Sequence, residues 1–214
     1  IALTPHQCAS LLPELPLCSK VLLGGGVITE GLRSQLPMEI EFWEGFGMTE
    51  TITHIAARRV RSEGEPPPFS ALPGVTFRTG NEGVLVIDAP NREVHDLETD
   101  DLVEIIDSQH FKWIGRESSI INSGGIKVIP EMVEREILEL MRPLQCEYIV
   151  RGVADDALGE KVVLRIDSDA LHKDVEEKLL QKIATLATLP SYHKPQEIEY
   201  GSINKSVLGK TRRL

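Results

Sequence analysis

Short apolar runs that lead into glycine-rich turns mark the first part of the chain. Residues 20–23 (Lys-Val-Leu-Leu) run into three glycines, and residues 40–43 (Ile-Glu-Phe-Trp) run toward a Gly-Phe-Gly turn. Runs of this length bounded by turn residues are typical of buried strands. Residues 8–15 have a helical apolar spacing that prolines interrupt, and the pattern over residues 51–60 is compatible with a second helix. We therefore expect an α/β arrangement here.

The middle of the chain, residues 74–116, has a different pattern. Short strands are expected at residues 84–87, 102–106 and 111–114, with turn residues between them. A proline-rich loop at residues 64–68 precedes this region. Strands spaced this regularly predict a small antiparallel sheet or barrel.

The last part of the chain, after Arg116, mixes helices with strands. A helix is expected from Pro130 to Pro143 and another around residues 175–186, because apolar residues recur there on one face. About three strands are expected, the clearest at residues 148–150 and 162–166. Roughly 95 residues of this kind are enough for a small independent α+β domain.

Composition and charge narrow the class of protein. The chain has 214 residues, of which 41% are hydrophobic and 26% charged, as in an ordinary globular protein. A net charge of −10 argues against a general nucleic-acid binder, and no apolar run reaches the roughly 20 residues of a membrane-spanning helix. Three cysteines without a CxxC pair fit a reducing cytoplasm, and six scattered histidines show no metal-ligand spacing. We expect a cytoplasmic protein without membrane insertion.

Two glycine-rich turns are candidates for contact with a nucleotide. The run Gly24-Gly25-Gly26 would let a ring or a phosphate approach the backbone, although such a run is more often only a turn. The segment Gly45–Glu50 adds an aromatic ring for stacking, the Thr49 hydroxyl for a phosphate oxygen and the Glu50 carboxylate for Mg²⁺. A following helix would place these groups at its N-terminus, which favours an anion; a hairpin or capping turn is the plain alternative.

Three further segments carry weaker signals. Thr99-Asp100-Asp101 precedes a strand, and either carboxylate can accept two hydrogen bonds from ribose hydroxyls, although adjacent acids at a strand edge usually face solvent. Gly124-Gly125 is a third glycine turn. Lys210 follows a glycine in a basic C-terminal tail, where it is either a mobile cation aimed at a phosphate or ordinary solvated surface.

The order of these segments is more informative than any one of them. Along the chain they are Glu44-Gly-Phe-Gly-Met-Thr-Glu50, Thr99-Asp-Asp101, Trp113-Ile-Gly-Arg116, Ile121-Asn-Ser-Gly-Gly-Ile-Lys-Val-Ile-Pro130 with Val133-Glu134, and Gly209-Lys210 with Arg212-Arg213. This order and spacing resemble the adenylate-forming superfamily of acyl-CoA synthetases, peptide-synthetase adenylation domains and luciferases. Within it, the chain most resembles o-succinylbenzoate–CoA ligases of menaquinone synthesis, through Leu3-Thr-Pro-His-Gln7, Leu22-Leu-Gly-Gly25, Met48-Thr-Glu-Thr51 with Thr53-His-Ile-Ala56, and Leu72-Pro-Gly-Val75.

The resemblance implies an architecture. Residues 1–116 would be the C-terminal part of a large AMP-binding domain, a sheet with a small β-barrel. Residues 117–118 would form a hinge, and residues 119–214 a small α+β lid domain. The family's phosphate-binding loop and much of its acyl-binding half would precede Ile1, and the chain begins without Met. We therefore expect a fragment that is inactive alone.

The resemblance also implies an ATP-dependent acid–CoA ligase. In the family a carboxylate attacks the α-phosphate of ATP, in the presence of Mg²⁺, to give an acyl-AMP and pyrophosphate. The lid then rotates, and the thiol of coenzyme A displaces AMP to form a thioester. The implied site residues are Gly24, Gly25, Gly26, Glu44, Gly45 and Phe46 at the adenine, Asp101 at the ribose, Arg116 at ribose or phosphate, Thr49 at the phosphate, Glu50 at Mg²⁺, Lys210 between the carboxylate and the α-phosphate, and Gly124 and Gly125 on the path of pantetheine. A cation such as Lys210 offsets the repulsion between two anions that must meet.

Some points depart from the family or stay open. The hinge residue is usually Asp or Lys in the family, and here it is Ser118. A dianionic acid would need a nearby cation, for which Arg58, Arg59 and Arg61 are candidates by proximity to the Thr-Glu motif.

Three alternatives to an o-succinylbenzoate–CoA ligase stay open. They are another small-acid or fatty-acid CoA ligase, an enzyme that loads a carrier protein, and a nucleotide-binding or interaction module without activity. A homo-oligomer is compatible with each.

Overall fold

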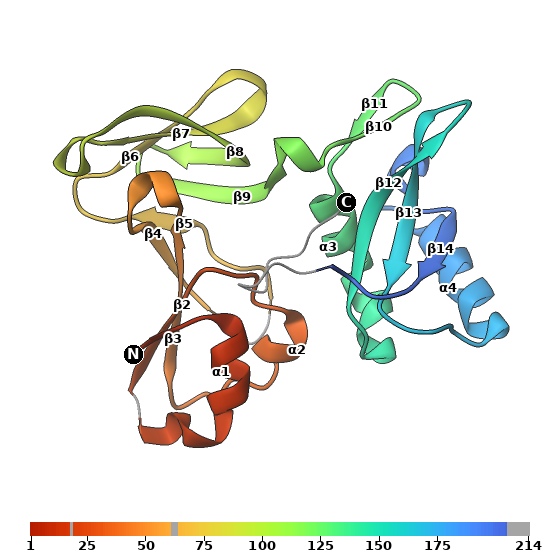
Figure 1. Cartoon of the computed structure of the whole chain (residues 1–214), viewed down its shortest axis with the longest axis horizontal. Coiled ribbons are helices and arrows are strands. Elements are labelled where there is room, and N and C mark those ends of the chain that lie inside the picture. The colour runs from red at the N-terminus through yellow and green to blue at the C-terminus, as the bar shows by residue number, and fades with distance from the viewer. Residues whose placement is uncertain (18, 61–63, 205–214) are drawn as a thin grey trace. The chain divides into compact units, whose positions relative to one another are not determined.

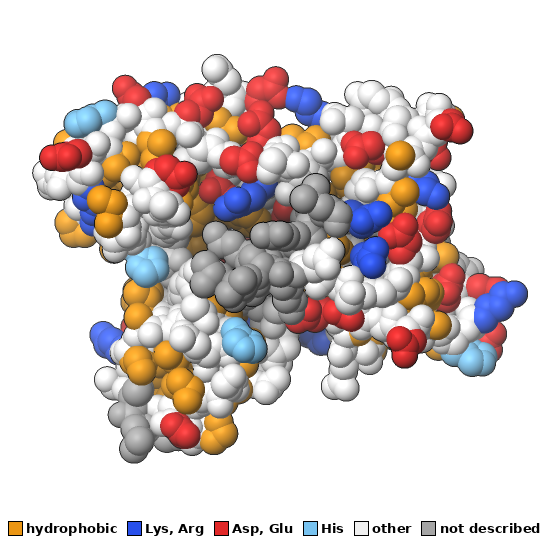
Figure 2. Space-filling view, viewed as in Figure 1, with side chains coloured by type: hydrophobic (Ala, Val, Ile, Leu, Met, Phe, Trp, Pro, Cys, Tyr) orange, Lys and Arg blue, Asp and Glu red, His pale blue; other side chains and the backbone are white. Residues whose placement is uncertain are grey.

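The computed structural model of the chain describes residues 1–17, 19–60 and 64–204 (Figure 1). These residues form two compact units, residues 1–113 and residues 114–204. Acidic and basic side chains are interspersed on the face drawn in Figure 2. No helix in the described ranges is both long and apolar enough to cross a membrane. The hinge at residues 117–118 stays a prediction.

Parallel strands alternate with short helices at the start of the first unit. In chain order the elements are β1 (Ala2–Leu3), α1 (Pro5–Leu11), a 3-10 helix (Leu12–Leu17), β2 (Lys20–Leu23), α2 (Glu30–Arg33) and β3 (Glu41–Gly47). Thr4 caps α1, since its side chain accepts a hydrogen bond from the Gln7 amide and its own amide donates to the Gln7 side chain. Pro13 then ends the α-helical hydrogen bonding, as the prolines in the sequence predict.

A hydrophobic core joins these helices to the sheet. Cys8 of α1 and Leu32 of α2 pack with Leu23 of β2 and Phe42 of β3, and Figure 1 shows both helices beside these two strands. The two strands expected from the apolar runs are confirmed, although β3 continues through the Gly-Phe-Gly segment to Gly47.

Antiparallel strands continue the same sheet. They are β4 (His54–Arg59), β5 (Phe69–Ala71), β6 (Thr76–Thr79), β7 (Val84–Ala89), β8 (Val94–Asp107) and β9 (His110–Arg116). The nine strands are ordered β1-β2-β3-β4-β5-β9-β8-β7-β6. The antiparallel strands expected in the middle of the chain are therefore confirmed, and hydrogen bonds connect them to the parallel part without a break.

The helix expected over residues 51–60 is wrong. A short 3-10 helix, η2 (Thr49–Thr51), is followed at once by strand β4, which pairs with β3 on one side and β5 on the other. Ile52 has a positive φ of 64°, which breaks a helical path. Pairing with β3 and β5 then overrides the helix propensity of the Ala and Arg residues in β4. The predicted helix N-terminus beside Thr49 is therefore absent from this segment.

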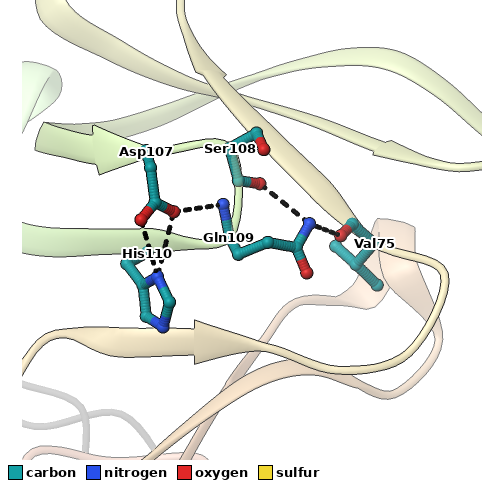
Figure 3. A network of polar contacts seen from close by, with 5 residues as sticks. All are labelled: Val75, Asp107, Ser108, Gln109 and His110. Atoms are coloured by element: carbon teal, nitrogen blue, oxygen red, sulfur yellow. Dashed lines mark hydrogen bonds and ion pairs between the residues drawn. The ribbon is translucent and has the colours of Figure 1, made fainter.

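A polar network fixes the turn between β8 and β9 (Figure 3). The Asp107 carboxylate accepts hydrogen bonds from the Gln109 amide at 2.7 Å and contacts the His110 ring at 2.9 Å. The Gln109 side chain donates to the Val75 carbonyl at 2.9 Å, which ties the turn to a distant loop. The hydrogen bond from the Gln109 amide, followed by that from His110, lowers the pKa of Asp107 below its usual value. The turn thus prefers the ionised carboxylate.

The second unit packs two helices on a five-stranded sheet. Its elements are β10 (Ile121–Ser123), β11 (Ile126–Val128), α3 (Pro130–Met141), β12 (Tyr148–Asp155), β13 (Gly159–Ile166), α4 (Lys173–Thr185) and β14 (Glu197–Tyr200). Its core joins Val133 and Ile137 of α3 and Ile183 of α4 to Leu164 of β13. Both predicted helices and both predicted strands are confirmed, while β10, β11 and β14 raise the strand number above the three expected.

Candidate functional site

The Gly24–Gly26 run and the Gly45–Gly47 end of β3 lie at the same edge of the sheet. Strands β2 and β3 are parallel, with Leu23 opposite Glu44. The run Gly24–Gly26 therefore starts beside the last residues of β3, which include Gly45 and Gly47. Ligands of open α/β sheets bind at the carboxyl ends of parallel strands, where side chains and loops leave space. The structure thus brings the first two glycine segments together.

The ring of His54 lies directly on two of these glycines. A Cβ atom placed on Gly24 would come within 2.6 Å of His54 Nε2, and one placed on Gly45 would come within 2.7 Å of the same atom. Side chains at either position would collide with the half-buried imidazole. Glycine is therefore required here for close packing, and neither position has the positive φ that favours glycine for backbone reasons.

The turn after β3 carries two exposed side chains, Thr49 and Glu50, on a backbone that is fixed by hydrogen bonds. The fully buried Thr51 hydroxyl donates to backbone carbonyls, at 3.1 Å from that of Met48 and 2.9 Å from that of Thr53. A Cβ atom on Gly47 would lie 2.6 Å from the Thr53 carbonyl oxygen, so the backbone is tightly folded here. Thr49 and Glu50, which this turn carries, are exposed. Both can reach a ligand from solvent.

A groove of about 420 Å³ adjoins the His54 ring. It is lined by Ile1, Lys20, Val21, Leu22, Trp43, Thr53, His54, Ala57 and Leu72, most of which are apolar. A second groove, of about 480 Å³, lies in the second unit between α4 and Pro195 and contains none of the predicted site residues. The described residues that line the first groove likewise include no predicted site residue, but among them is His54, which packs on Gly24 and Gly45.

Side chains from β4, β5 and β9 hold Glu44 and Phe46 in place. Arg58 Nε donates to Glu44 Oε2 at 2.6 Å, and both side chains are largely buried. The Phe46 ring packs against Phe69 and Phe111, with centroids 5.4 and 5.2 Å away. These contacts fix two residues for which the family resemblance predicts a place at the adenine.

Asp101 lies on β8 and is 3% exposed. Trp113 Nε1 donates to Asp101 Oδ1 at 2.9 Å, which orients the carboxylate. Trp113 packs against the same hydrophobic cluster as Phe46, because Phe111 lies two residues before it on β9. A single aromatic cluster therefore supports both Phe46 and the partner of Asp101. Asp101 is buried, in contrast to the solvent-facing alternative.

The remaining predicted residues lie in the second unit or outside the described part. Arg116 ends β9 and Ser118 lies in a 3-10 helix (Glu117–Ser119), both exposed. Gly124 and Gly125 form the two-residue turn between β10 and β11, with φ of 57° and 81°. Such a hairpin turn requires positive φ at both positions, which is a second reason for glycine besides space. Lys210 falls outside the described residues.

The donor set near the turn fits a magnesium ion held with phosphates. Mg²⁺ in nucleotide sites takes one or two carboxylates together with phosphate oxygens, and exposed Glu50 offers one carboxylate. Among the described residues, no group of three or more His, Cys, Asp or Glu side chains gathers to hold a metal on its own. Burial raises the pKa of the Cys8 and Cys146 thiols, so neither is a reactive thiolate at neutral pH.

The sequence did not predict that His54 and Arg58 pack against candidate site residues. His54 appeared only as part of a family resemblance, and Arg58 only as a cation for the acid. Two glycines on adjacent parallel strands, at positions that do not need positive φ, signal that a side chain covers them. The partner strand β4 could then be searched for that side chain. No such signal identifies the Arg58–Glu44 pair.

Comparisons with known proteins agree with this fold. No family model matches the chain. The human mitochondrial acyl-coenzyme A synthetase ACSM2A is 34% identical over 109 residues, which cover 49% of this chain and 18% of that protein. MenE of E. coli, solved with an analogue of OSB-AMS, is 25% identical with a TM-score of 0.70 and covers 93% of this chain and 46% of that one.

The o-succinylbenzoate coenzyme A synthetase (MenE) of Bacillus subtilis, solved with ATP and a magnesium ion, covers the whole chain at a TM-score of 0.74 and 21% identity. This chain spans about half of the length of these two solved structures, at 46% and 50%. The mixed α/β sheets match that part of the adenylate-forming fold, which confirms the predicted fold class. In fold and in sequence, the chain is thus similar to the acyl-CoA synthetases of the adenylate-forming, AMP-binding superfamily.

Proposed function

We propose that the chain is part of an ATP-dependent acid–CoA ligase, which joins an acid to AMP and then transfers the acyl group to coenzyme A. One observation carries the proposal. Parallel β2 ends in the Gly24–Gly26 run beside the glycine-containing end of β3, and the turn after β3 presents a hydroxyl and a carboxylate to solvent. This arrangement suits a nucleotide, because backbone approaches the ligand while polar side chains meet the phosphates and their metal.

In the proposed site the nucleotide lies along the sheet edge. Gly24–Gly26 and Glu44–Phe46 line the adenine, and Asp101 accepts hydrogen bonds from the ribose hydroxyls. The aromatic cluster that holds both Phe46 and Trp113 supports this assignment, since it connects the proposed base and ribose contacts through one packed core. Arg116 contacts ribose or phosphate.

Thr49 and Glu50 are proposed to act at the phosphates. The Thr49 hydroxyl donates to a phosphate oxygen, and the Glu50 carboxylate holds Mg²⁺ when the ion is bound. Bound Mg²⁺ would neutralise charge on the phosphates of ATP. The buried Thr51 hydroxyl supports this role, because it fixes the backbone of the turn that carries both side chains.

The lid supplies a different group to each half-reaction. Lys210 is proposed to bridge the acid carboxylate and the α-phosphate while the acyl-adenylate forms. The turn at Gly124-Gly125 lines the path of pantetheine in the second half-reaction, after rotation about Ser118. No described atom lies within 4 Å of a Cβ atom built on Gly125, so the turn leaves space beside it for the narrow pantetheine chain.

For the acid we propose an aromatic or keto dicarboxylate such as o-succinylbenzoate, as in menaquinone synthesis. The likeness to E. coli MenE, whose structure holds an analogue of OSB-AMS, supports this choice. The likeness to ACSM2A, named an acyl-coenzyme A synthetase, favours another acid as the second candidate. Turnover of o-succinylbenzoate well above that of a medium-chain fatty acid is expected, and equal or better turnover of the fatty acid would remove the first candidate.

We also propose a cytoplasmic location. Cys8 and Cys146 are free thiols in the structure, as expected for a reducing compartment. A homo-oligomer remains compatible with this proposal.

The two half-reactions test the function separately, in a full-length protein that contains this chain. Lys210→Ala should lower acyl-adenylate formation, measured as pyrophosphate release, by roughly 10²–10³-fold or more, because a positioned cation no longer stabilises the developing charge. Thioester formation from supplied acyl-AMP should be spared. Gly125→Leu should show the converse pattern. If Lys210→Ala slows both steps equally, the two-step assignment is wrong.

A further inference from the structure

The ion pair between Arg58 and Glu44 joins the two strands that flank the candidate site. The two residues are directly opposite each other in the antiparallel pairing of β3 with β4. Arg58 Nε donates to Glu44 Oε2 at 2.6 Å, and the side chains are only 15% and 17% exposed. The other carboxylate oxygen, Oε1, accepts no hydrogen bond from the described residues around it. Glu44 therefore has one fixed oxygen and one acceptor left for a ligand.

The same guanidinium also contacts the aromatic cluster. Arg58 Cζ lies 4.2 Å from the centroid of the Phe69 ring, a cation–π distance. Phe69 in turn packs against Phe46, with centroids 5.4 Å apart. One side chain thus touches Glu44 directly and Phe46 through a single neighbour, and both are proposed to line the adenine.

Such a pair is a poor device for stability alone. Removing two charges from water costs about as much as their attraction returns, and a well-packed apolar pair of the same size is often at least as stable. What the pair provides is geometry, since the flat guanidinium stacks on Phe69 and fixes the direction of the carboxylate. A cation that is engaged in this way is not available as the partner of a dianionic acid.

We propose that Arg58 is a positioning residue of the nucleotide site, and this rests on the proposed function. It holds the Glu44 carboxylate so that Oε1 accepts a hydrogen bond from the 6-amino group of adenine. A carboxylate acceptor favours an amino group over the oxo group that hypoxanthine carries at the same position. The pair therefore contributes to the choice of base, and Arg58 acts only through Glu44 and the aromatic cluster.

Equilibrium binding of AMP and of IMP to a full-length protein that contains this chain, measured by calorimetry, tests the proposal. The wild type should bind AMP more tightly than IMP. Arg58→Gln should weaken AMP by about 10-fold, the loss of one hydrogen bond to a charged group, and IMP much less. Arg58→Lys should recover part of the preference, because it restores the charge.

Two further variants separate positioning from a general loss of structure. Arg78→Gln breaks a comparable but exposed arginine–carboxylate pair, with Asp96, in the same unit and should leave both affinities unchanged. In a Glu44→Ala background, Arg58→Gln should not change the ratio of AMP to IMP affinity any further, because the acceptor is already gone. The melting temperature of each variant, read by circular dichroism, reports on folding independently.

The outcomes distinguish this inference from the proposed function. If the wild type binds neither nucleotide, the nucleotide site itself is refuted and the role of Arg58 with it. If the wild type prefers AMP and Arg58→Gln keeps that preference while its melting temperature falls, Arg58 is only structural. The proposed function would then stand, and this inference would be overturned.

Discussion

Replacing Gly45 by alanine should destabilise the first unit through a single side chain. A Cβ atom at this position would lie 2.7 Å from His54 Nε2 and closer still to Cδ2. Cβ atoms in real structures almost never approach other heavy atoms within 3.0 Å, so either the ring or strand β3 has to move. The ring is the softer of the two, because it can rotate away from the sheet.

The size of the effect follows from two opposing contributions. Overpacking of this kind costs about 1–3 kcal/mol. Replacing a strand glycine by alanine recovers about 0.5–1 kcal/mol, because the unfolded chain loses freedom. We expect Gly45→Ala to lower the free energy of unfolding by about 1–2 kcal/mol in the wild-type background. In a His54→Ala background the obstacle is gone, and Gly45→Ala should be neutral or slightly stabilising.

Tryptophan fluorescence during denaturant unfolding measures this difference selectively. The chain contains two tryptophans, and both Trp43 and Trp113 lie in the first unit. Gly31→Ala is the matched control, since a Cβ atom there meets nothing within 4 Å and the residue lies in helix α2. It should leave stability unchanged or raise it by up to about 1 kcal/mol.

A double-mutant cycle tests whether the His54 ring is what requires glycine at position 45. A coupling between Gly45→Ala and His54→Ala of about 1–3 kcal/mol is expected, as for residues in direct contact. Equal destabilisation by Gly45→Ala with and without the His54 ring would show that the ring is not what requires glycine at this position.

Two more predictions concern hydrogen-bonded polar side chains. Asp101→Ala removes the acceptor of the Trp113 indole N–H and should cost about 1–3 kcal/mol in urea unfolding, and Asp101→Asn less; equal costs would contradict this. Burial first, and then the hydrogen bond to Glu176, raise the pKa of Tyr200 to about 12. Because the neutral phenol is favoured in the folded state, this contribution to stability is present below pH about 10 and is lost as the pH rises toward 12. Tyr200→Phe should abolish that part of the loss, together with the last phenolate step in an absorbance titration.

Local sequence patterns predicted most of the strands because the signal is itself local. The run at residues 20–23 is short, apolar and ends in glycine, and it forms β2 as expected. The amphipathic stretch from Pro130 forms α3, whose apolar stripe faces the core. In both places the residues that form the element also specify its ends.

Residues 51–60 show where such reasoning fails. Their composition is ambiguous between helix and strand, and the outcome is set by β3 and β5, which offer edges for hydrogen bonding on both sides of β4. The packing of His54 on Gly24 and Gly45 also depends on three different strand ends or turns meeting in space. Sequence order predicts the chemistry of the candidate site, but the side chains that support it depend on tertiary contacts.

The glycine turn between β10 and β11 is attached to a neighbouring turn, and this limits which sequences the neighbour can adopt. The Gly124 amide donates to the Leu158 carbonyl at 2.8 Å, and the Asn122 amide donates to the Glu160 carboxylate at 2.7 Å. An insertion or deletion in the β12–β13 turn would therefore displace the glycine turn as well. In a mutational scan, Glu160 should show the intolerance usually associated with ligand contacts, although we assign no ligand to it, whereas the exposed Leu158, which contributes only its backbone carbonyl, should tolerate substitution.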